Sequence, residues 1–208
     1  SNTWKLTNIE GLSDKDQLEK FVAWGNKIES YDFSKMTKLK SINLIGSPVK
    51  EIKGLSAAGS NLTSLDLGST QISSLDVTQN TELQNLNLSY VKGITTLDLS
   101  NNTHLTKLTT NDSGIRELKL GSKNGLKKIN VSSSNLSSLD ISEAGTIENI
   151  AVGLQTDATG QNQQIKVTMT QQQKDYFDSK GIIFTENIIS DNSDKNRPNS
   201  NVKVVIKQ

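Results

Sequence analysis

The 208-residue sequence lacks cysteine altogether and contains only two prolines, and aromatic residues make up 4% of the chain. The absence of cysteine excludes disulfide bonds and thiolate metal sites. No stretch of about 18 apolar residues occurs, so no helix is expected to span a membrane. The 23 Lys and Arg residues balance 22 Asp and Glu residues, and no block of one sign is present. Nucleic-acid binding through a basic surface is therefore not expected.

Residues suited to catalysis are also scarce. His104 is the only histidine, and it follows Asn101, Asn102 and Thr103 in a segment that is typical of a turn. The sequence has no nucleophile elbow, phosphate-binding loop or pair of histidines at metal-ligand spacing. We therefore expect His104 to be a solvated turn residue. We expect the protein to be no enzyme and to bind neither a cofactor nor a metal.

What the chain does contain is a repeat. The pattern L-x-x-L-x-L recurs about every 10 or 11 residues, as in Leu62, Leu65 and Leu67. The first apolar position of each unit falls at Ile28, Leu39, Val49, Leu62, Ile72, Leu83, Ile94, Leu105, Ile115, Leu126, Leu136 and Ile147. A recurrence of this kind indicates a solenoid, in which the repeated residues form the core and function lies on the surface.

Alternate units differ in their turns, so two units make one coil of the solenoid. Coils then begin at Leu39, Leu62, Leu83, Leu105, Leu126 and Ile147. The alternation within each L-x-L step predicts a short strand, so each coil has two strands on opposite sides. Stacked coils place these strands about 4.8 Å apart in two parallel sheets. The sequence predicts a β-rich leucine-rich-repeat solenoid of about six coils.

Two segments carry a more specific resemblance: "LQNLNLSYVKGITTLDLSNNTHLTKLTTNDSGIRELKL" and "LKKINVSSSNLSSLDISEAGTIENIAV". They resemble the 21-residue leucine-rich repeats of bacterial surface proteins, in particular the internalin-like subclass. The resemblance covers roughly residues 28–152. It implies a non-catalytic binding module, exported to the cell surface or periplasm.

The sequence departs from that family at one inward position. The Asn or Cys that the family places after the concave strand is replaced by Ser47, Thr70, Val91, Ser113 and Ser134. Ser and Thr still form hydrogen bonds to the turn, whereas the Val91 side chain cannot. We therefore expect the turn at Val91 to be closed differently from the others.

Both ends of the solenoid require a cover. Residues 13–25 predict an N-terminal cap helix, with Ser13 as N-cap, Leu18, Phe21 and Val22 on one apolar face, and Gly25 as the stop. At the other end, residues 165–169 alternate as a strand. Thr170 and Gln173 then match a capping box, which predicts a helix ending at Gly181 and a last strand at 182–184.

These features divide the chain into an N-terminal cap (1–27), the solenoid (28–152), a C-terminal cap (153–189) and a polar linker with a terminal strand (190–208). The terminal strand runs from Val202 to Ile206. Two alternatives remain open for it: pairing with a sheet edge of its own chain, or pairing with a partner.

Aspartates recur at one position of the longer units, at Asp32, Asp76, Asp98 and Asp140. Stacked about 4.8 Å apart, they would form an acidic column able to hold a cation. Lys53 and Lys119 interrupt the same column, however. The alternative is that each aspartate bonds the amides of its own turn.

The outward positions of the concave sheet form a small, polar strip. The candidate binding residues there are Asn85, Asn87, Tyr90, Lys107, Thr109, Lys128 and Asn130. Tyr90 lies at its edge and is its best aromatic anchor. We expect a monomer that recognises a protein or glycan through this strip. The alternative function is a structural or assembly element that docks through its C-terminal strand.

Overall fold

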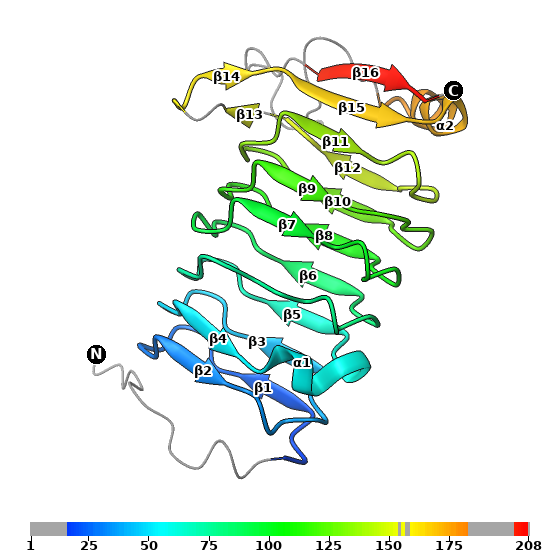
Figure 1. Ribbon diagram of the computed structural model, residues 1–208. Coiled ribbons are helices and arrows are strands. Elements are labelled where there is room, and N and C mark those ends of the chain that lie inside the picture. The colour runs from blue at the N-terminus through cyan, green and yellow to red at the C-terminus, as the bar shows by residue number, and fades with distance from the viewer. Residues whose placement is uncertain (1–15, 154, 157–158, 183–201, 208) are drawn as a thin grey trace.

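The computed structural model describes residues 16–153, 155–156, 159–182 and 202–207. The chain winds into a stack of coils with short parallel strands on two opposite faces and an apolar core between them (Figure 1). The predicted leucine-rich-repeat solenoid is thereby confirmed. None of the helices in these described ranges is long and apolar enough to cross a membrane.

One face is a continuous seven-stranded parallel sheet, and it carries the positions predicted for the concave sheet. In order it consists of β1 (Lys20–Val22), β3 (Ser41–Asn43), β5 (Ser64–Asp66), β6 (Asn85–Asn87), β8 (Lys107–Thr109), β10 (Lys128–Asn130) and β12 (Asn149–Ala151). Each strand is three residues long, with its central side chain turned into the core and its flanking side chains turned outward. This alternation is the one that the L-x-L steps require.

The opposite face is divided into separate sheets. They are β2 (Ser30–Asp32) with β4 (Glu51–Lys53), β7 (Thr96–Asp98) with β9 (Glu117–Lys119), and β11 (Ser138–Asp140) with β15 (Ile165–Met169) and β16 (Val202–Ile206). Between β4 and β5 the chain forms α1 (Leu55–Ala58) and the short 3-10 helix η2 (Gly59–Asn61). These two turns of helix account for the longer interval between the units that begin at Val49 and Leu62.

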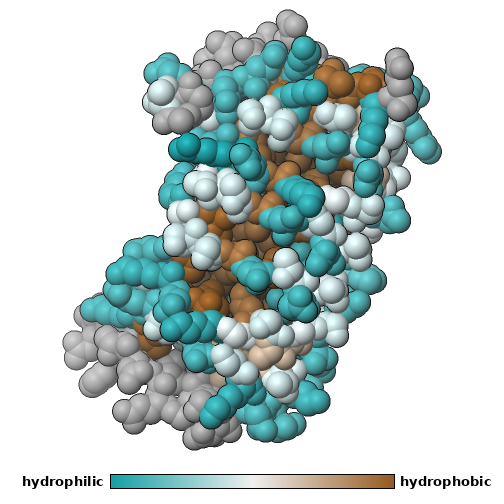
Figure 2. Space-filling model, in the orientation of Figure 1, coloured by the Kyte–Doolittle hydropathy of each residue, from teal (hydrophilic) through white to brown (hydrophobic). Residues whose placement is uncertain are grey.

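The core follows the repeat throughout. All twelve first positions of the units, from Ile28 to Ile147, are buried. Leu86, Leu108 and Ile129 pair in one register across β6, β8 and β10, which confirms the predicted column. From the side, apolar residues form a continuous band along the solenoid between polar margins (Figure 2). Each coil therefore buries its apolar residues against its neighbours.

The N-terminal cap helix predicted for residues 13–25 is wrong for residues 16–25. Residues 20–22 form β1, which pairs in parallel with β3. Leu18, Phe21 and Ala23 have the spacing of the repeat, and Phe21 enters the core, where its ring contacts Tyr31 and Phe33 edge to face. The solenoid therefore begins one unit earlier than predicted.

The C-terminal strand and helix are confirmed. β15 pairs with β11, and α2 (Gln171–Ser179) follows it. The capping box is present, because Thr170 Oγ1 accepts from the Gln173 backbone N–H and Gln173 Oε1 accepts from the Thr170 backbone N–H. Before them, the two-residue strands β13 (Gln155–Thr156) and β14 (Asn162–Gln163) pair antiparallel. The predicted strand at 182–184 and linker at 190–200 lie outside the described residues, except for Ile182.

The terminal strand pairs within its own chain. β16 runs parallel to β15 with five residue pairs in register, from Ile165–Val202 to Met169–Ile206. β15, β16 and α2 lie together at the C-terminal end of the stack (Figure 1). Of the two alternatives for this strand, the intramolecular one describes the structure.

Candidate binding surface

The predicted strip lies on three adjacent strands. In the pairing of β6, β8 and β10, Asn85, Lys107 and Lys128 form one row. A second row contains Asn87, Thr109 and Asn130. Side chains two positions apart on a strand share a face, so both rows face outward from the same side of the sheet. The structure therefore brings together the residues that the sequence singled out.

The lysine row is electrostatically unbalanced. Lys107 and Lys128 are direct neighbours across β8 and β10, and both are exposed. Within the described ranges neither belongs to any of the ion pairs, although the adjacent Lys127 pairs with Glu148 at 3.3 Å. Two cations of one row on adjacent strands repel each other at this spacing. A carboxylate bound between them would relieve that repulsion.

The amides of the second row are already engaged. Asn87 Oδ1 accepts hydrogen bonds from the N–H and hydroxyl of Ser89 (3.0 and 2.6 Å), and its Nδ2 donates to Asp66 (2.9 Å). Asn130 accepts the same pair of bonds from Ser132. These side chains fix the turns that follow the strands. The groups left to meet a ligand are mainly those of Asn85, Lys107 and Lys128.

Tyr90 stands at a special backbone position at the edge of the strip. Its φ angle is 63°, in the left-handed region, and 55% of the residue is exposed. The equivalent positions of the other coils also have positive φ and are occupied by Gly25, Gly46, Ser69, Asp112 and Ser133. Each of these residues donates its N–H to the next coil, in the case of Tyr90 to the Asn111 carbonyl at 2.9 Å. Stacking therefore holds a bulky residue in a conformation that costs about 1–2 kcal/mol.

Changing Tyr90 to glycine tests this cost. Glycine adopts positive φ readily but gains freedom in the unfolded chain. We expect the Tyr90→Gly variant to be as stable as the wild type or more stable by up to about 1 kcal/mol, as measured by urea unfolding. Tyr90→Ala keeps the unfavourable conformation and serves as the control. A Tyr90→Gly variant clearly less stable than Tyr90→Ala would contradict a backbone cost at this position, because both variants lack the ring and differ only in how readily they adopt positive φ.

Sequence reasoning missed part of this surface. Because residues 20–22 form a strand, Val22 and Trp24 also face outward beside Asn43 and Ile45. Trp24 is 68% exposed. The signal was present in the sequence, since Leu18, Phe21 and Ala23 repeat the spacing of the later units. The strip therefore has a tryptophan at its N-terminal end. This residue was not predicted to lie there, because its segment was expected to form a helix.

A second polar feature was also missed, at the turns that follow the opposite face. Asn80, Asn102 and Lys123 are completely buried there, each three residues before a coil start. Asn80 Nδ2 donates to the carbonyls of Leu55 and Gly59, both at 3.0 Å. Asn102 Nδ2 donates to those of Val77 and Asn80. These side chains tie each coil to the one before it.

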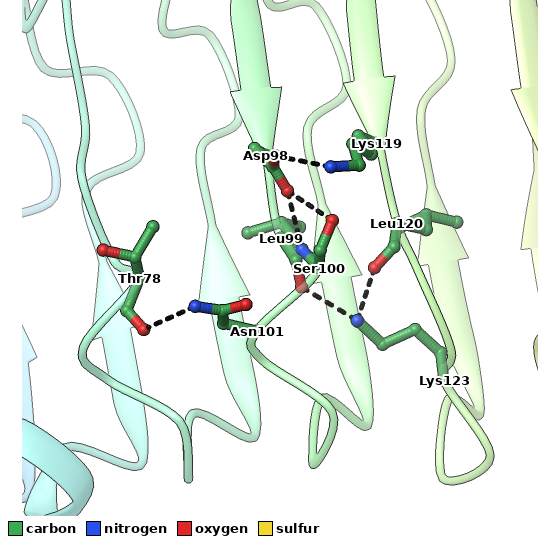
Figure 3. Close-up of polar contacts among 8 residues, drawn as sticks. All are labelled: Thr78, Asp98, Leu99, Ser100, Asn101, Lys119, Leu120 and Lys123. Atoms are coloured by element: carbon green, nitrogen blue, oxygen red, sulfur yellow. Dashed lines mark hydrogen bonds and ion pairs between the residues drawn. The ribbon is translucent and has the colours of Figure 1, made fainter.

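Lys123 continues this column with a cation. Its Nζ donates to the carbonyls of Leu99 (2.9 Å) and Leu120 (2.5 Å), as Figure 3 shows. It also donates to the Ser122 carbonyl (3.2 Å), so three N–H groups meet three acceptors. Burial lowers the pKa of Lys123 to about 8, while the charge of Asp98 acts in the opposite direction. Beyond Lys123, Gln173 of α2 donates to the carbonyls of Ile141 and Ala144 in a similar way.

Replacing Lys123 by methionine should lower the free energy of unfolding by about 2 kcal/mol, because the Leu120 carbonyl loses its donor inside the protein. The Leu99 carbonyl keeps the Asn102 backbone N–H (2.9 Å). Lys123→Asn introduces the residue that two other coils have at this position. This variant should lose less stability than Lys123→Met. Equal urea midpoints for the wild type and Lys123→Met would contradict this role for Lys123.

The pH dependence of the free energy of unfolding gives a second test of the role of Lys123. The lowered pKa means that the folded protein releases the Lys123 proton near pH 8, whereas the unfolded chain keeps it to about 10.5. The unfolded state therefore binds more protons in this window, and the stability of the wild type relative to Lys123→Asn should rise from pH 8 to 10.5.

The inward serine and threonine column forms the expected hydrogen bonds. Ser47 Oγ donates to the Ala23 carbonyl (2.9 Å), Thr70 Oγ1 to that of Leu67 (2.7 Å), and Ser134 Oγ to that of Thr110 (2.8 Å). At Val91 the side chain takes no part in closing the turn, as expected. Its backbone N–H donates to the Leu88 carbonyl at 3.2 Å, the same bond that closes the turn at Thr70. The backbone alone therefore closes this turn.

The aspartates of the predicted acidic column accept hydrogen bonds from their own turns. Oδ1 of Asp32, Asp76, Asp98 and Asp140 accepts from the backbone N–H two residues on, at 2.8–2.9 Å. Hydrogen bonds from the hydroxyl and N–H of Ser100, with Lys119 close by, lower the pKa of Asp98 to about 2. In the part of the chain that the structure describes, no group of three acidic or histidine residues is placed to hold a metal. His104 is an exposed turn residue, 3.3 Å from Glu82.

No protein-family model matches the sequence, and no curated protein matches it. Solved structures do match. The functional domain of InlJ from Listeria monocytogenes, described as including a cysteine ladder, has a TM-score of 0.64 and 23% identity, over 80% of this chain and 39% of that chain. The leucine-rich-repeat protein LIC12759 of Leptospira interrogans has a TM-score of 0.54 and 15% identity, over 84% of this chain and 56% of that chain.

The chain therefore spans less than two thirds of the length of either neighbour. At these identities the likeness concerns the fold. The fold is that of a leucine-rich-repeat solenoid of the internalin-like type, as the resemblance in the sequence predicted.

Proposed function

We propose that the protein is a non-catalytic binding module that recognises a protein or glycan through the outer face of its seven-stranded sheet. The observation that carries this proposal is the row of Asn85, Lys107 and Lys128, placed side by side on three strands with both lysines exposed. Stacking fixes these side chains on one rigid face before a ligand arrives. Such preorganisation reduces the entropy that binding costs.

The chemistry of the described residues favours recognition over catalysis. The aspartates bond their own turns, and the one histidine is solvated beside Glu82. The lysine pair favours a partner with carboxylate or other acidic groups. We further propose that the protein is exported and acts at the bacterial cell surface, as its internalin-like fold suggests.

The test begins with capture of the partner from the surface fraction of the native organism, followed by its purification. Reversing both charges in Lys107→Glu/Lys128→Glu should weaken binding to that partner at least about tenfold, which is about 1.4 kcal/mol. The melting temperature should not change, because both side chains are exposed. Titration calorimetry measures the affinity.

Lys38→Glu/Lys53→Glu is the matched control, since it makes the same charge change at exposed positions outside the strip. Loss of affinity in the control alone, or unchanged affinity in the strip variant, would contradict recognition by this face.

The alternative, assembly through the C-terminal strand, receives less support. β16 is already paired with β15 over its whole length. Assembly through this strand predicts that deleting residues 201–208 abolishes partner binding while the strip variant binds normally. Recognition by the strip predicts the opposite pair of results, so the two variants separate the functions.

A further inference from the structure

The large apolar side chains on the surface are gathered on one side. Four such residues are exposed in the part of the chain that the structure describes: Val22, Trp24, Ile45 and Tyr90. All four come from β1, β3 and β6 or from the residues directly after them, on the outer side of the seven-stranded sheet. Large exposed apolar residues that gather on one face indicate an interaction surface.

Backbone hydrogen bonds fix Trp24 beside Ile45. The ladder between β1 and β3 continues past the strands, because Ala23 N–H donates to the Asn43 carbonyl (2.9 Å) and Gly25 N–H to the Ile45 carbonyl (3.2 Å). Val22 lies two residues before Trp24 on the same face. Three apolar side chains thus form one contiguous group, which we call the apolar end.

The apolar end adjoins a stretch with little side-chain bulk. Gly68 follows Ile45 in the next coil, and the Ile45 Cδ1 atom lies 3.4 Å from the place of a Cβ at Gly68. Ser69 comes next in that coil, and its N–H donates to the Ser89 carbonyl (2.7 Å). Tyr90 directly follows Ser89 in the chain. Small residues therefore separate the apolar end from the Tyr90 ring.

The same columns become polar toward the C-terminal end. Past Tyr90 they carry Asn111 and Ser132, while the row on the other side of each strand carries Lys107 and Lys128. Four strand spacings separate β1 from β8, which is about 19 Å. An extended peptide of about six residues spans that distance. The face thus presents the apolar end near β1 and the lysine pair on β8 and β10 within reach of one short segment, although the exposed Lys20 of β1 lies in the same row as that pair.

We propose that this face binds an extended segment of a partner protein that presents aromatic or aliphatic side chains to the apolar end and carboxylates to Lys107 and Lys128. This inference rests on the proposed function and names its class of partner. Charge complementarity selects this occupant, because an apolar partner would leave the lysine pair uncompensated. Trp and Tyr are the residue types that most often dominate binding energy at interfaces, and here they occur at two separate points.

The experiment uses a display library of random dodecapeptides selected on the full chain. Enriched peptides should combine aromatic or aliphatic residues with Asp or Glu about six residues away. A synthetic peptide of the enriched sequence is then titrated against the wild type, Trp24→Ser, Lys107→Glu/Lys128→Glu and the control Lys38→Glu/Lys53→Glu. We expect at least tenfold weaker binding for the first two variants and no change for the control.

The outcomes distinguish the two proposals. If Trp24→Ser binds the peptide normally while the lysine variant does not, the apolar end plays no part and this inference fails, although the proposed function stands. If both variants bind normally, both proposals fail. Enriched peptides without acidic residues would also overturn the inference.

A fluorescence measurement addresses other occupants of the apolar end. Trp4→Phe leaves Trp24 as the only tryptophan of the chain. We expect emission typical of a solvated indole that acrylamide quenches readily at all protein concentrations. A blue shift that grows with concentration would identify a second copy of the chain as the occupant. A blue shift that disappears when residues 1–15 are deleted would identify that segment, and either result overturns the inference.

Discussion

Truncation after Gly160 should abolish the soluble, cooperatively folded state of the protein. The deletion removes β14, β15, α2 and β16, and with them the buried side chains Val167 and Phe177. The last coil would then expose Ile150 and Val152 at an open end. End coils of repeat proteins need a polar cover for solubility. We expect aggregation in size-exclusion chromatography and no sharp melting transition.

The shorter deletion of residues 201–208 is the control for this experiment. It removes β16 alone and leaves β15 paired with β11, and Gln173 bonded to the carbonyls of Ile141 and Ala144. This variant should remain soluble and melt cooperatively at a lower temperature. A truncation after Gly160 that stays monomeric and melts like the wild type would refute the role of the C-terminal elements as a cover.

The Leu108→Ala variant should lose about 2–5 kcal/mol of stability. Leu108 is completely buried, and it pairs in register with the equivalent residues of the adjacent coils, Leu86 and Ile129, in the same apolar core. Its removal leaves a cavity in the middle of the stack, where strands on both sides limit collapse. Urea unfolding monitored by circular dichroism measures the loss.

Leu118→Ala provides a matched comparison. Leu118 belongs to the same coil but lies half-buried on the opposite face. The Leu118→Ala variant should therefore lose clearly less stability than Leu108→Ala. A loss under about 1 kcal/mol at Leu108, or equal losses at the two positions, would mean that the continuous sheet does not dominate the core.

The core could be predicted from the sequence because one period specifies it. At twelve successive units, from Ile28 to Ile147, an apolar residue at the first position is buried. The N-terminal unit was missed because Leu18, Phe21 and Val22 also satisfy the spacing of a helical face. Pairing with β3 decides between the two structures, and such a nonlocal contact is not visible in a short window of sequence.

The positions on the outer face of the seven-stranded sheet could be predicted for the same reason, except at its N-terminal end. The repeat correctly placed Asn85, Lys107 and Lys128 in one row. Trp24 was absent from that prediction because its segment was expected to be helical. Lys123 was missed on other grounds, since a lysine is almost never buried unless its charge is satisfied. Only the three converging carbonyls explain its place in the core.

The unequal division of the two faces has a mechanical consequence. One face is a single hydrogen-bonded ladder from β1 to β12, whereas the other consists of separate ladders, with breaks between β4 and β7 and between β9 and β11. Tension along the long axis would therefore be carried chiefly by the seven-stranded face. The opposite face would open first at its two breaks. The solenoid would then bend, with the continuous sheet on the inner side of the bend. Such bending would leave the rows on the continuous face in register while the distance between the two ends of the molecule changes.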